Sequence, residues 1–266
     1  MQTWKVPGAD LAVEYSDEGG PAVVQLHGLT SSRARDRVLG LDLGRGLSGT
    51  RLLRYDARGH GQSTGSHDPT DYTWKRLADD LLTLLDQYFP GETVHGAGPS
   101  MGTGTLLHAA LRAPERFSGL TLIIPPTAWT TRPAQAQAYL TAADLVEQNG
   151  IGAFVDAGRA VTPPPAAVPH SETGPDITED LLPTVFRGAA LSDLPAPGDL
   201  ARIDVPVTVL AWIDDPAHPV STAERLVELL PQATLTVART PNDVEQWPGV
   251  LVADVARGHV GGLRRQ

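Results

Sequence analysis

The sequence predicts an α/β protein with a mostly parallel sheet flanked by helices. Short apolar runs alternate along the chain with longer stretches whose apolar residues recur at helical spacing, a pattern typical of βαβ units. Several of these runs are apolar throughout, as expected for strands that are buried on both faces. A chain of 266 residues is long enough for one large domain that carries an insertion.

The first half of the chain contains most of the predicted sheet. A helix is expected between the Tyr72 and Gln87 positions, because Trp74 and the leucines that follow it form one apolar face. A second helix is expected over Met101–Arg112, ending before Pro114. The expected strands are Thr3–Val6 and Leu11–Tyr15 as an entry hairpin, then Pro21–Leu26, Arg51–Tyr55, Thr93–Ala97 and Leu120–Ile124.

The last part of the chain returns to the same alternation. Ser221 and Glu224 have the spacing of a capping box and predict the start of a helix there. The expected elements are the strands Val207–Ala211 and Ala233–Ala238 and the helices Ala223–Leu230 and Trp247–Arg257.

Residues 127–202 interrupt this rhythm. The run from Tyr139 to Val146 indicates a helix, and the prolines between Pro163 and Pro197 break up the rest of the segment. Leucine, phenylalanine and tryptophan are spread through the segment, which argues against a mobile linker. We therefore expect residues 1–126 and 203–266 to form the core and residues 127–202 to form a mostly helical cap over the strand ends.

Composition excludes several classes of function. The formal net charge of −10 makes nucleic acid and anionic membranes poor partners. The chain has no cysteine, so it cannot form disulfides, a thiol nucleophile or a thiolate metal site. The start, Met1–Gly8, lacks the apolar stretch of a signal peptide, and no later run reaches the roughly 18 apolar residues of a membrane span. We expect a cytoplasmic protein.

The most specific motif is Gly98-Pro99-Ser100-Met101-Gly102, which fits Gly-x-Ser-x-Gly. It lies between a predicted strand and a predicted helix, the context of a nucleophile elbow. A serine on such a sharp turn has its hydroxyl exposed above the sheet edge, and the glycines let the backbone turn without Cβ clashes. Ser100 is therefore the candidate nucleophile.

Two further segments, in order, make the chain resemble the α/β-hydrolase superfamily. His27-Gly28-Leu29-Thr30 resembles its oxyanion-hole segment, and Tyr55–Ser63 resembles the turn after its next strand. The resemblance covers nearly all of the chain and implies the α/β-hydrolase fold with an inserted helical cap. The run from Tyr55 to Asp86 is similar to the 3-oxoadipate enol-lactonase branch.

The resemblance implies a role for several positions. Ser100 would need a neighbouring base to accept its proton. The backbone N–H groups of Leu29 and Met101 would form the oxyanion hole, where negative charge develops in the transition state. His27 and His60 are expected to be structural, oriented by the turns that contain them.

The acid is expected where the strand ending near Trp212 gives way to a loop. Asp215 matches the family's acid position best, and Asp214 is the alternative. An aspartate pair that merely starts a turn is a third interpretation.

The base departs from the family's pattern. The resemblance places a histidine between the last strand and the closing helix, but residues 238–247 contain none. His218 lies three residues after Asp215, on a loop at the strand ends that face the nucleophile in this architecture. We predict His218 as the base. His259, expected in a tail after the closing helix, is the alternative, and a loop histidine that only packs on Pro219 is also open.

These residues predict a serine hydrolase of a small carboxylic ester or lactone that acts through an acyl-enzyme. Its partner would be a small-molecule substrate, with no cofactor and no metal, because dinucleotide, P-loop and His-Glu-x-x-His patterns are missing. The alternative is a degenerate relative without the usual histidine, which binds a small molecule or acts as a non-hydrolytic lyase or cyclase.

Overall fold

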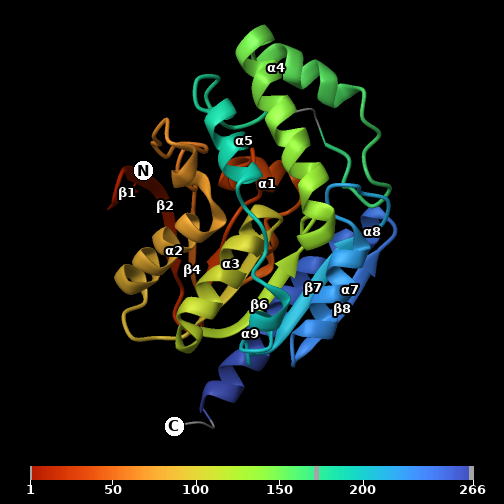
Figure 1. The fold of residues 1–266 in the computed structure, drawn as a ribbon. Coiled ribbons are helices and arrows are strands. Elements are labelled where there is room, and N and C mark those ends of the chain that lie inside the picture. The colour runs from red at the N-terminus through yellow and green to blue at the C-terminus, as the bar shows by residue number, and fades with distance from the viewer. Residues whose placement is uncertain (1, 171–173, 264–266) are drawn as a thin grey trace.

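The computed structural model describes residues 2–170 and 174–263. A central sheet is covered by helices on both faces, and further helices lie beyond one end of the strands (Figure 1). In the described part of the chain the strand order is β1-β2-β4-β3-β5-β6-β7-β8. β2 is antiparallel to β1 and β4, and the remaining pairs are parallel. The predicted mostly parallel sheet is confirmed.

The strands agree closely with the predicted runs. β6 begins at Phe117 and not at Leu120, because Phe117 and Gly119 already pair with β5. The bounds are β1 Gln2–Val6, β2 Ala9–Asp17, β3 Ala22–Gln25, β4 Arg51–Tyr55, β5 Val94–Pro99, β6 Phe117–Ile123, β7 Val207–Trp212 and β8 Ala233–Ala238.

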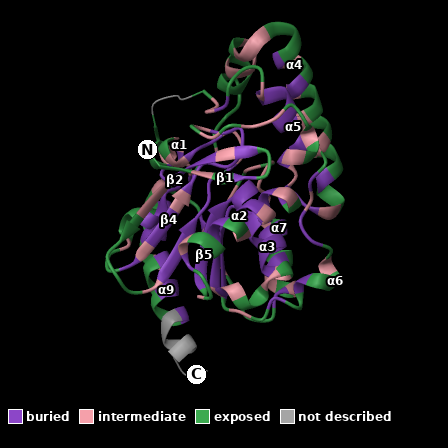
Figure 2. Ribbon diagram, turned by 90° about the vertical axis from the view of Figure 1, so that its left-hand side faces the viewer, coloured by how far each residue is buried: buried purple, intermediate pink, exposed green. Residues whose placement is uncertain are grey.

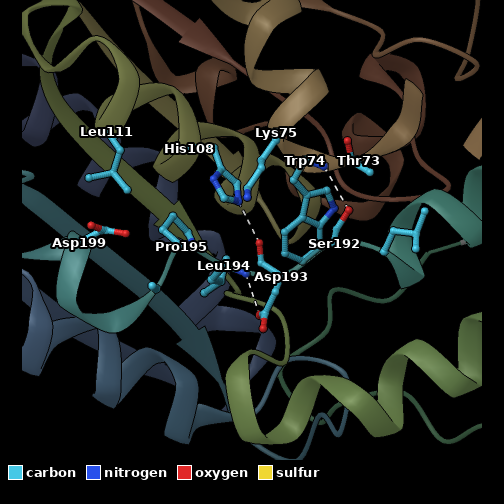
Figure 3. A pocket seen from close by; sticks show the side chains of 12 residues that line it. Thr73, Trp74, Lys75, His108, Leu111, Ser192, Asp193, Leu194, Pro195 and Asp199 are labelled. Atoms are coloured by element: carbon cyan, nitrogen blue, oxygen red, sulfur yellow. Dashed lines mark hydrogen bonds between the residues drawn. The ribbon is translucent and has the colours of Figure 1, made fainter. Parts of the chain in front are cut away.

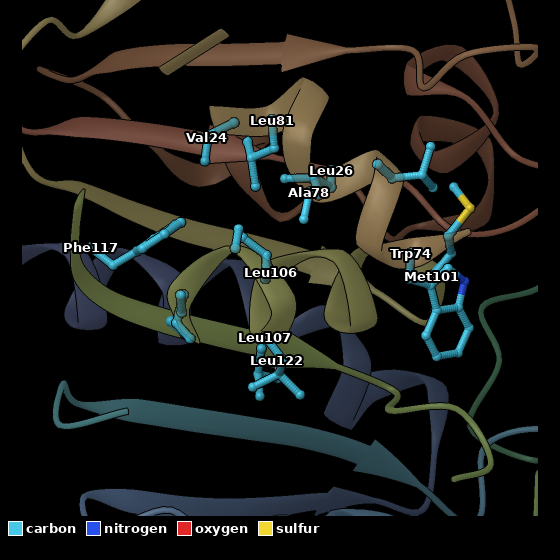
Figure 4. Packing of buried hydrophobic residues seen from close by; sticks show 14 of the residues in the cluster. Val24, Leu26, Trp74, Ala78, Leu81, Met101, Leu106, Leu107, Phe117 and Leu122 are labelled. Carbon is cyan, nitrogen blue, oxygen red and sulfur yellow. The ribbon is translucent and has the colours of Figure 1, made fainter. Parts of the chain in front are cut away.

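One face of the sheet packs against α2 (Trp74–Tyr88), α3 (Met101–Arg112) and α7 (Val220–Leu229). The apolar face predicted for α2 is the face that meets this cluster (Figure 4). Gly104 allows close packing, because a Cβ there would come within 2.3 Å of Cε3 of Trp74. The close approach of α2 to α3 keeps the N-terminal end of α3, where Ser100 lies, firmly packed.

The other face carries α1 (Arg33–Leu39), η1 (Leu43–Gly46) and α9 (Trp247–Leu263). Neighbouring strand residues divide between the two faces: Val24 packs with α2 and α3, whereas Val23 packs with Trp247 of α9. Because side chains on both faces are buried in β3, β5 and β7, these central strands are buried at every position (Figure 2).

Two sequence predictions about helix ends are wrong. α7 begins at Val220 with Pro219 as its N-cap, so Ser221 lies inside the first turn and does not cap it. Extended Pro219 sets the start, since Thr222 N–H already donates to its carbonyl. α9 continues to Leu263, which places His259 within the helix and not in a tail after it.

Residues 127–202 are here named the cap segment: residues 129–159 and 182–190 lie beyond the sheet end, whereas residues 191–202 return along the core and bury Leu194 and Leu200 in its cluster (Figure 1). The helices of the cap segment are η4 (Trp129–Thr131), α4 (Arg132–Arg159), α5 (Leu182–Ala190) and α6 (Pro197–Leu200). α4 bends at Gly150, whose φ of 81° and ψ of 168° are not helical. The inner sides of α4 and α5 bury a shared cluster that includes Val146, Val185 and Phe186.

The remaining short helices are η2 (Pro69–Tyr72), η3 (Pro114–Arg116) and α8 (Pro241–Glu245). Within residues 2–170 and 174–263, no helix has both the length and the apolar character needed to cross a membrane.

Candidate active site

Ser100 stands on the sharp turn between β5 and α3. Its φ of 50° and ψ of −107° put a non-glycine residue in a strained conformation, and its N–H donates to the Ile123 carbonyl at 2.9 Å. The glycines of the motif are needed for space. A Cβ at Gly98 or at Gly102 would lie 3.0 Å from Cβ of Leu26, directly after β3. This crowding keeps the serine turn in place.

His218 and Asp215 come from the loop after β7 and meet Ser100. His218 Nδ1 is 2.8 Å from Asp215 Oδ2, and His218 Nε2 is 2.8 Å from Ser100 Oγ. A carboxylate accepts hydrogen bonds, so Nδ1 carries the proton and donates it to Asp215. Nε2 is then left as an acceptor for the Ser100 hydroxyl. The three side chains form one continuous chain of hydrogen bonds.

The loop is shaped around the Asp215 carboxylate. Oδ2 also accepts the indole N–H of Trp212 at 2.7 Å, and Oδ1 accepts the Ala217 N–H at 2.9 Å. Burial alone would raise the pKa of Asp215, but the bonds from His218, Trp212 and Ala217 outweigh it and hold that pKa below its ordinary value. The Thr127 N–H donates to the Ala217 carbonyl at 2.9 Å and anchors the loop to the segment after β6. Asp215 is therefore a fixed anion beside His218.

The two candidate acids differ in their surroundings. Asp214 is exposed, with a φ of 58°, whereas its neighbour Asp215 accepts the hydrogen bond from His218. His259 lies near the end of α9, and its side chain is outside the described part of the structure. The loop that lacks the expected histidine contains α8, started by a capping box between Thr240 and Asp243.

Leu29 and Met101 lie on the two segments that border Ser100. Met101 is the first residue of α3, so its N–H is at the positive end of the helix dipole. Gly28 packs closely on the serine turn, since a Cβ there would be 3.8 Å from Cβ of Ser100. In the described ranges, neither the Leu29 N–H nor the Met101 N–H donates a hydrogen bond. Both donors are thus available for a ligand oxygen.

His27 joins two neighbouring loops, and His60 Nδ1 is 2.9 Å from the Arg58 carbonyl of its own loop. The Ala57 N–H donates to His27 Nε2 at 2.9 Å, which leaves Nδ1 as the donor to the Gly28 carbonyl at 2.7 Å. Burial lowers the pKa of His27 and lowers that of His60 to about 3, so both rings are neutral near pH 7. Their contacts are those of structural residues.

Asp36 is a buried acid close to the Leu29 segment. The Ser31 hydroxyl donates to Asp36 Oδ1 at 2.5 Å, and Oδ2 has no partner among the described residues. Burial raises the pKa of Asp36 from 3.8 to about 7. The Asp36 carboxyl group therefore stays protonated in the native state at pH values where it is ionised in the unfolded chain.

We expect Asp36→Asn to change how stability depends on pH. A raised native pKa makes ionisation favour the unfolded chain, so this group destabilises the fold progressively as pH rises from about 4 to about 7. Urea unfolding at pH 4.5 and pH 8 should show that the wild type loses stability relative to Asp36→Asn as pH rises. A difference that is equal at both pH values would contradict the raised pKa.

A separate cavity of about 390 Å³ lies between the start of α2, the C-terminal half of α3 and residues 191–199 (Figure 3). His108 lines it, and its Nε2 is 2.9 Å from the Asp193 carbonyl. None of Ser100, Asp215 and His218 lines this cavity. Within the described residues, no group of three or more histidines and acidic residues is placed to hold a metal ion.

Comparison with known proteins agrees with the fold. A family model described as "alpha/beta hydrolase fold" matches residues 21–148. The chain is 31% identical to 3-oxoadipate enol-lactonase 2 of Acinetobacter baylyi over 207 residues, which cover 73% of each protein. It is 32% identical to RutD of Agrobacterium fabrum, provisionally assigned as a carbamate hydrolase, over 70% of this chain and 72% of that protein.

Solved structures show the same architecture. A thermophilic esterase from Thermogutta terrifontis superimposes with a TM-score of 0.74 over 96% of this chain and 99% of its own, at 20% identity. Sequence and structure together place the serine turn within a known hydrolase fold. The chain belongs to the α/β-hydrolase family.

Proposed function

We propose that this protein hydrolyses small carboxylic esters or lactones through a serine acyl-enzyme. The observation that carries the proposal is the hydrogen-bond chain from Ser100 Oγ to His218 Nε2 and from His218 Nδ1 to Asp215 Oδ2, each 2.8 Å long. These contacts join a nucleophile, a base and an orienting carboxylate, the set that acyl transfer requires.

In the acylation step, Ser100 Oγ attacks the carbonyl carbon of the ester while His218 Nε2 takes the hydroxyl proton. The carbonyl oxygen becomes an oxyanion, which accepts hydrogen bonds from the N–H groups of Leu29 and Met101. The tetrahedral intermediate then expels the alkoxide, which receives the proton from His218. Asp215 stabilises the transient imidazolium without taking its proton. In a lactone, the leaving alcohol stays attached to the acyl group.

In the deacylation step, His218 takes a proton from water as the water oxygen attacks the acyl carbon. The second tetrahedral intermediate collapses, Ser100 Oγ leaves with the proton from His218, and the carboxylic acid is released. The same residues serve in both steps. No oxidant, reductant or cofactor enters the balance.

The location of His218 bears on the alternative function. The empty histidine position in residues 238–247 favours a degenerate, non-hydrolytic relative. A base on the same loop as the acid supplies the missing group, because triads are defined by geometry and not by chain order. The names of the compared proteins, a lactonase, an esterase and a provisional carbamate hydrolase, also support hydrolysis at a carbonyl group.

The first test is covalent labelling with a fluorophosphonate. This reagent modifies only activated serines, so we expect one adduct per chain, located on Ser100 by peptide mass spectrometry and absent from Ser100→Ala. Turnover of p-nitrophenyl acetate and of a simple lactone and carbamate should accompany labelling. An unlabelled wild type that binds but does not turn over these compounds would favour the non-hydrolytic alternative.

A further inference from the structure

Asp176 connects the cap segment to the two core loops next to Ser100. Its N–H donates to the Thr30 carbonyl at 2.9 Å, and its own carbonyl accepts the Gly61 N–H at 2.7 Å. Its carboxylate Oδ2 accepts the Ser32 hydroxyl at 2.5 Å. A single cap residue thereby makes three hydrogen bonds to the core.

The first of these loops, residues 27–32, contains the Leu29 N–H. The Gly28 carbonyl accepts the Ser31 N–H at 3.2 Å, so the loop turns tightly around Leu29. Thr30 has a φ of 60°, a left-handed conformation that is costly for a β-branched residue and persists only when its surroundings fix it. The Thr30 carbonyl is held by Asp176, immediately after the proposed oxyanion donor.

The Ser32 hydroxyl gives the Asp176 carboxylate a second hold on this loop. Ser32 is the N-cap of α1, and its Oγ accepts the Arg35 N–H at 3.1 Å. Because the Ser32 hydroxyl proton points to Asp176, a lone pair of the Ser32 oxygen faces the first turn of α1. The loop that carries Leu29 is thus tied at Thr30 and again at Ser32.

The second loop, residues 56–63, is tied through Asp56 to Arg33, the residue directly after the first loop. The Asp56 carboxylate accepts the backbone N–H of Arg33 at 3.0 Å and its guanidinium at 3.0 and 3.1 Å. Gly61 lies on this loop with a φ of 53°, and its N–H reaches Asp176. Asp176 therefore lies at the junction of both loops.

Packing of the cap sets the position of Asp176. The next residue, Ile177, is buried in the cluster that joins Phe186 of α5 to Tyr72 of the core. Ile177 cannot move without opening that cluster, so the Asp176 backbone is held from the cap side.

We propose that Asp176 is a positioning residue that holds the Leu29 N–H toward the oxyanion formed at Ser100. The inference rests on the proposed function. An oxyanion donor acts only within about 2.7–3.1 Å of the developing charge. A small shift of the loop therefore reduces the stabilisation of the transition state more than it reduces the affinity for substrate. Loss of the hydrogen bond from Ser32 to the Asp176 carboxylate should therefore lower kcat and leave KM nearly unchanged.

The test compares Asp176→Ala with Asp176→Asn in the full chain. The alanine variant loses the acceptor for Ser32, whereas the asparagine amide oxygen can still accept that hydroxyl. We expect Asp176→Ala to lower kcat for p-nitrophenyl acetate by roughly 10- to 100-fold, with Asp176→Asn restoring most of it. The control is Asp180→Ala, an exposed cap aspartate whose carboxylate is 3.9 Å from His67, and it should match the wild type.

Amide hydrogen exchange provides a readout that does not depend on activity. Exchange in residues 27–33 should be roughly tenfold faster in Asp176→Ala, and near the wild-type rate in Asp176→Asn. Unchanged exchange in an active Asp176→Ala variant would show that the Asp176 carboxylate does not hold the loop. Faster exchange with unchanged kcat would overturn the positioning role, as would a kcat loss that only follows the folded fraction. An inactive wild type whose loop still loosens in Asp176→Ala would instead overturn the proposed function.

Discussion

His218→Ala should lower kcat for a p-nitrophenyl ester by about 10⁴-fold or more, the loss typical of removing the base from a serine triad. Without the imidazole, the Ser100 hydroxyl has no acceptor for its proton, because the 2.8 Å contact to Nε2 is its link to Asp215. Residual catalysis from the oxyanion hole should remain above the rate in water. Initial rates at pH 8, for wild type and variant side by side, would measure the effect.

His259→Ala is the matched control. It removes the histidine that sequence order offered as the alternative base, and we expect its kcat to equal that of the wild type. A full loss of activity in His259→Ala together with normal turnover in His218→Ala would reverse the assignment. Ser100→Ala should match His218→Ala in kcat, and the double variant should lose little more, because the two residues act as a unit.

Asp80→Ala should lower the free energy of unfolding by about 3–5 kcal/mol, the cost of leaving a buried charge without its partner. The guanidinium of Arg58 is fully buried and makes two 2.7 Å hydrogen bonds to the Asp80 carboxylate, which is 2% exposed. Asp71 is 3.2 Å away, but it is partly exposed and cannot replace a bidentate partner. Urea unfolding followed by circular dichroism would measure the loss.

Asp79→Ala provides the comparison one residue away on α2. Asp79 pairs with Arg112, but both side chains are nearly half exposed, so this ion pair should contribute no more than about 1 kcal/mol. Equal losses in the two variants would show that burial of the Arg58–Asp80 pair carries no special cost. A small loss for Asp80→Ala alone would mean that water or Asp71 compensates Arg58.

Much of the fold follows from local pattern. Every predicted strand is present, and the central strands are recognisable because burial on both faces requires apolar residues at successive positions such as Val23 and Val24. Helix ends were less well predicted: a capping box at Ser221 was outweighed by extended Pro219, whose place depends on how the preceding loop returns to the sheet. The end of α9 differs from the prediction because Gly258, directly after Arg257, is a residue type that often follows a helix end, whereas here it continues the helix and packs against Ser118.

Ser100 could be predicted as the candidate nucleophile from sequence, since a Gly-x-Ser-x-Gly turn between a strand and a helix is a local arrangement. The sequence narrowed the acid to Asp214 or Asp215 and left two histidines. Which of these side chains come into contact with Ser100 depends on the three-dimensional arrangement of the strands. The order β5-β6-β7 puts the loop after β7 two strands, about 10 Å, from the serine turn, and the turn from Asp215 to His218 spans that gap. The physical reason is that loop direction depends on contacts distant in sequence, such as the Thr127 N–H on the Ala217 carbonyl, which no local pattern records.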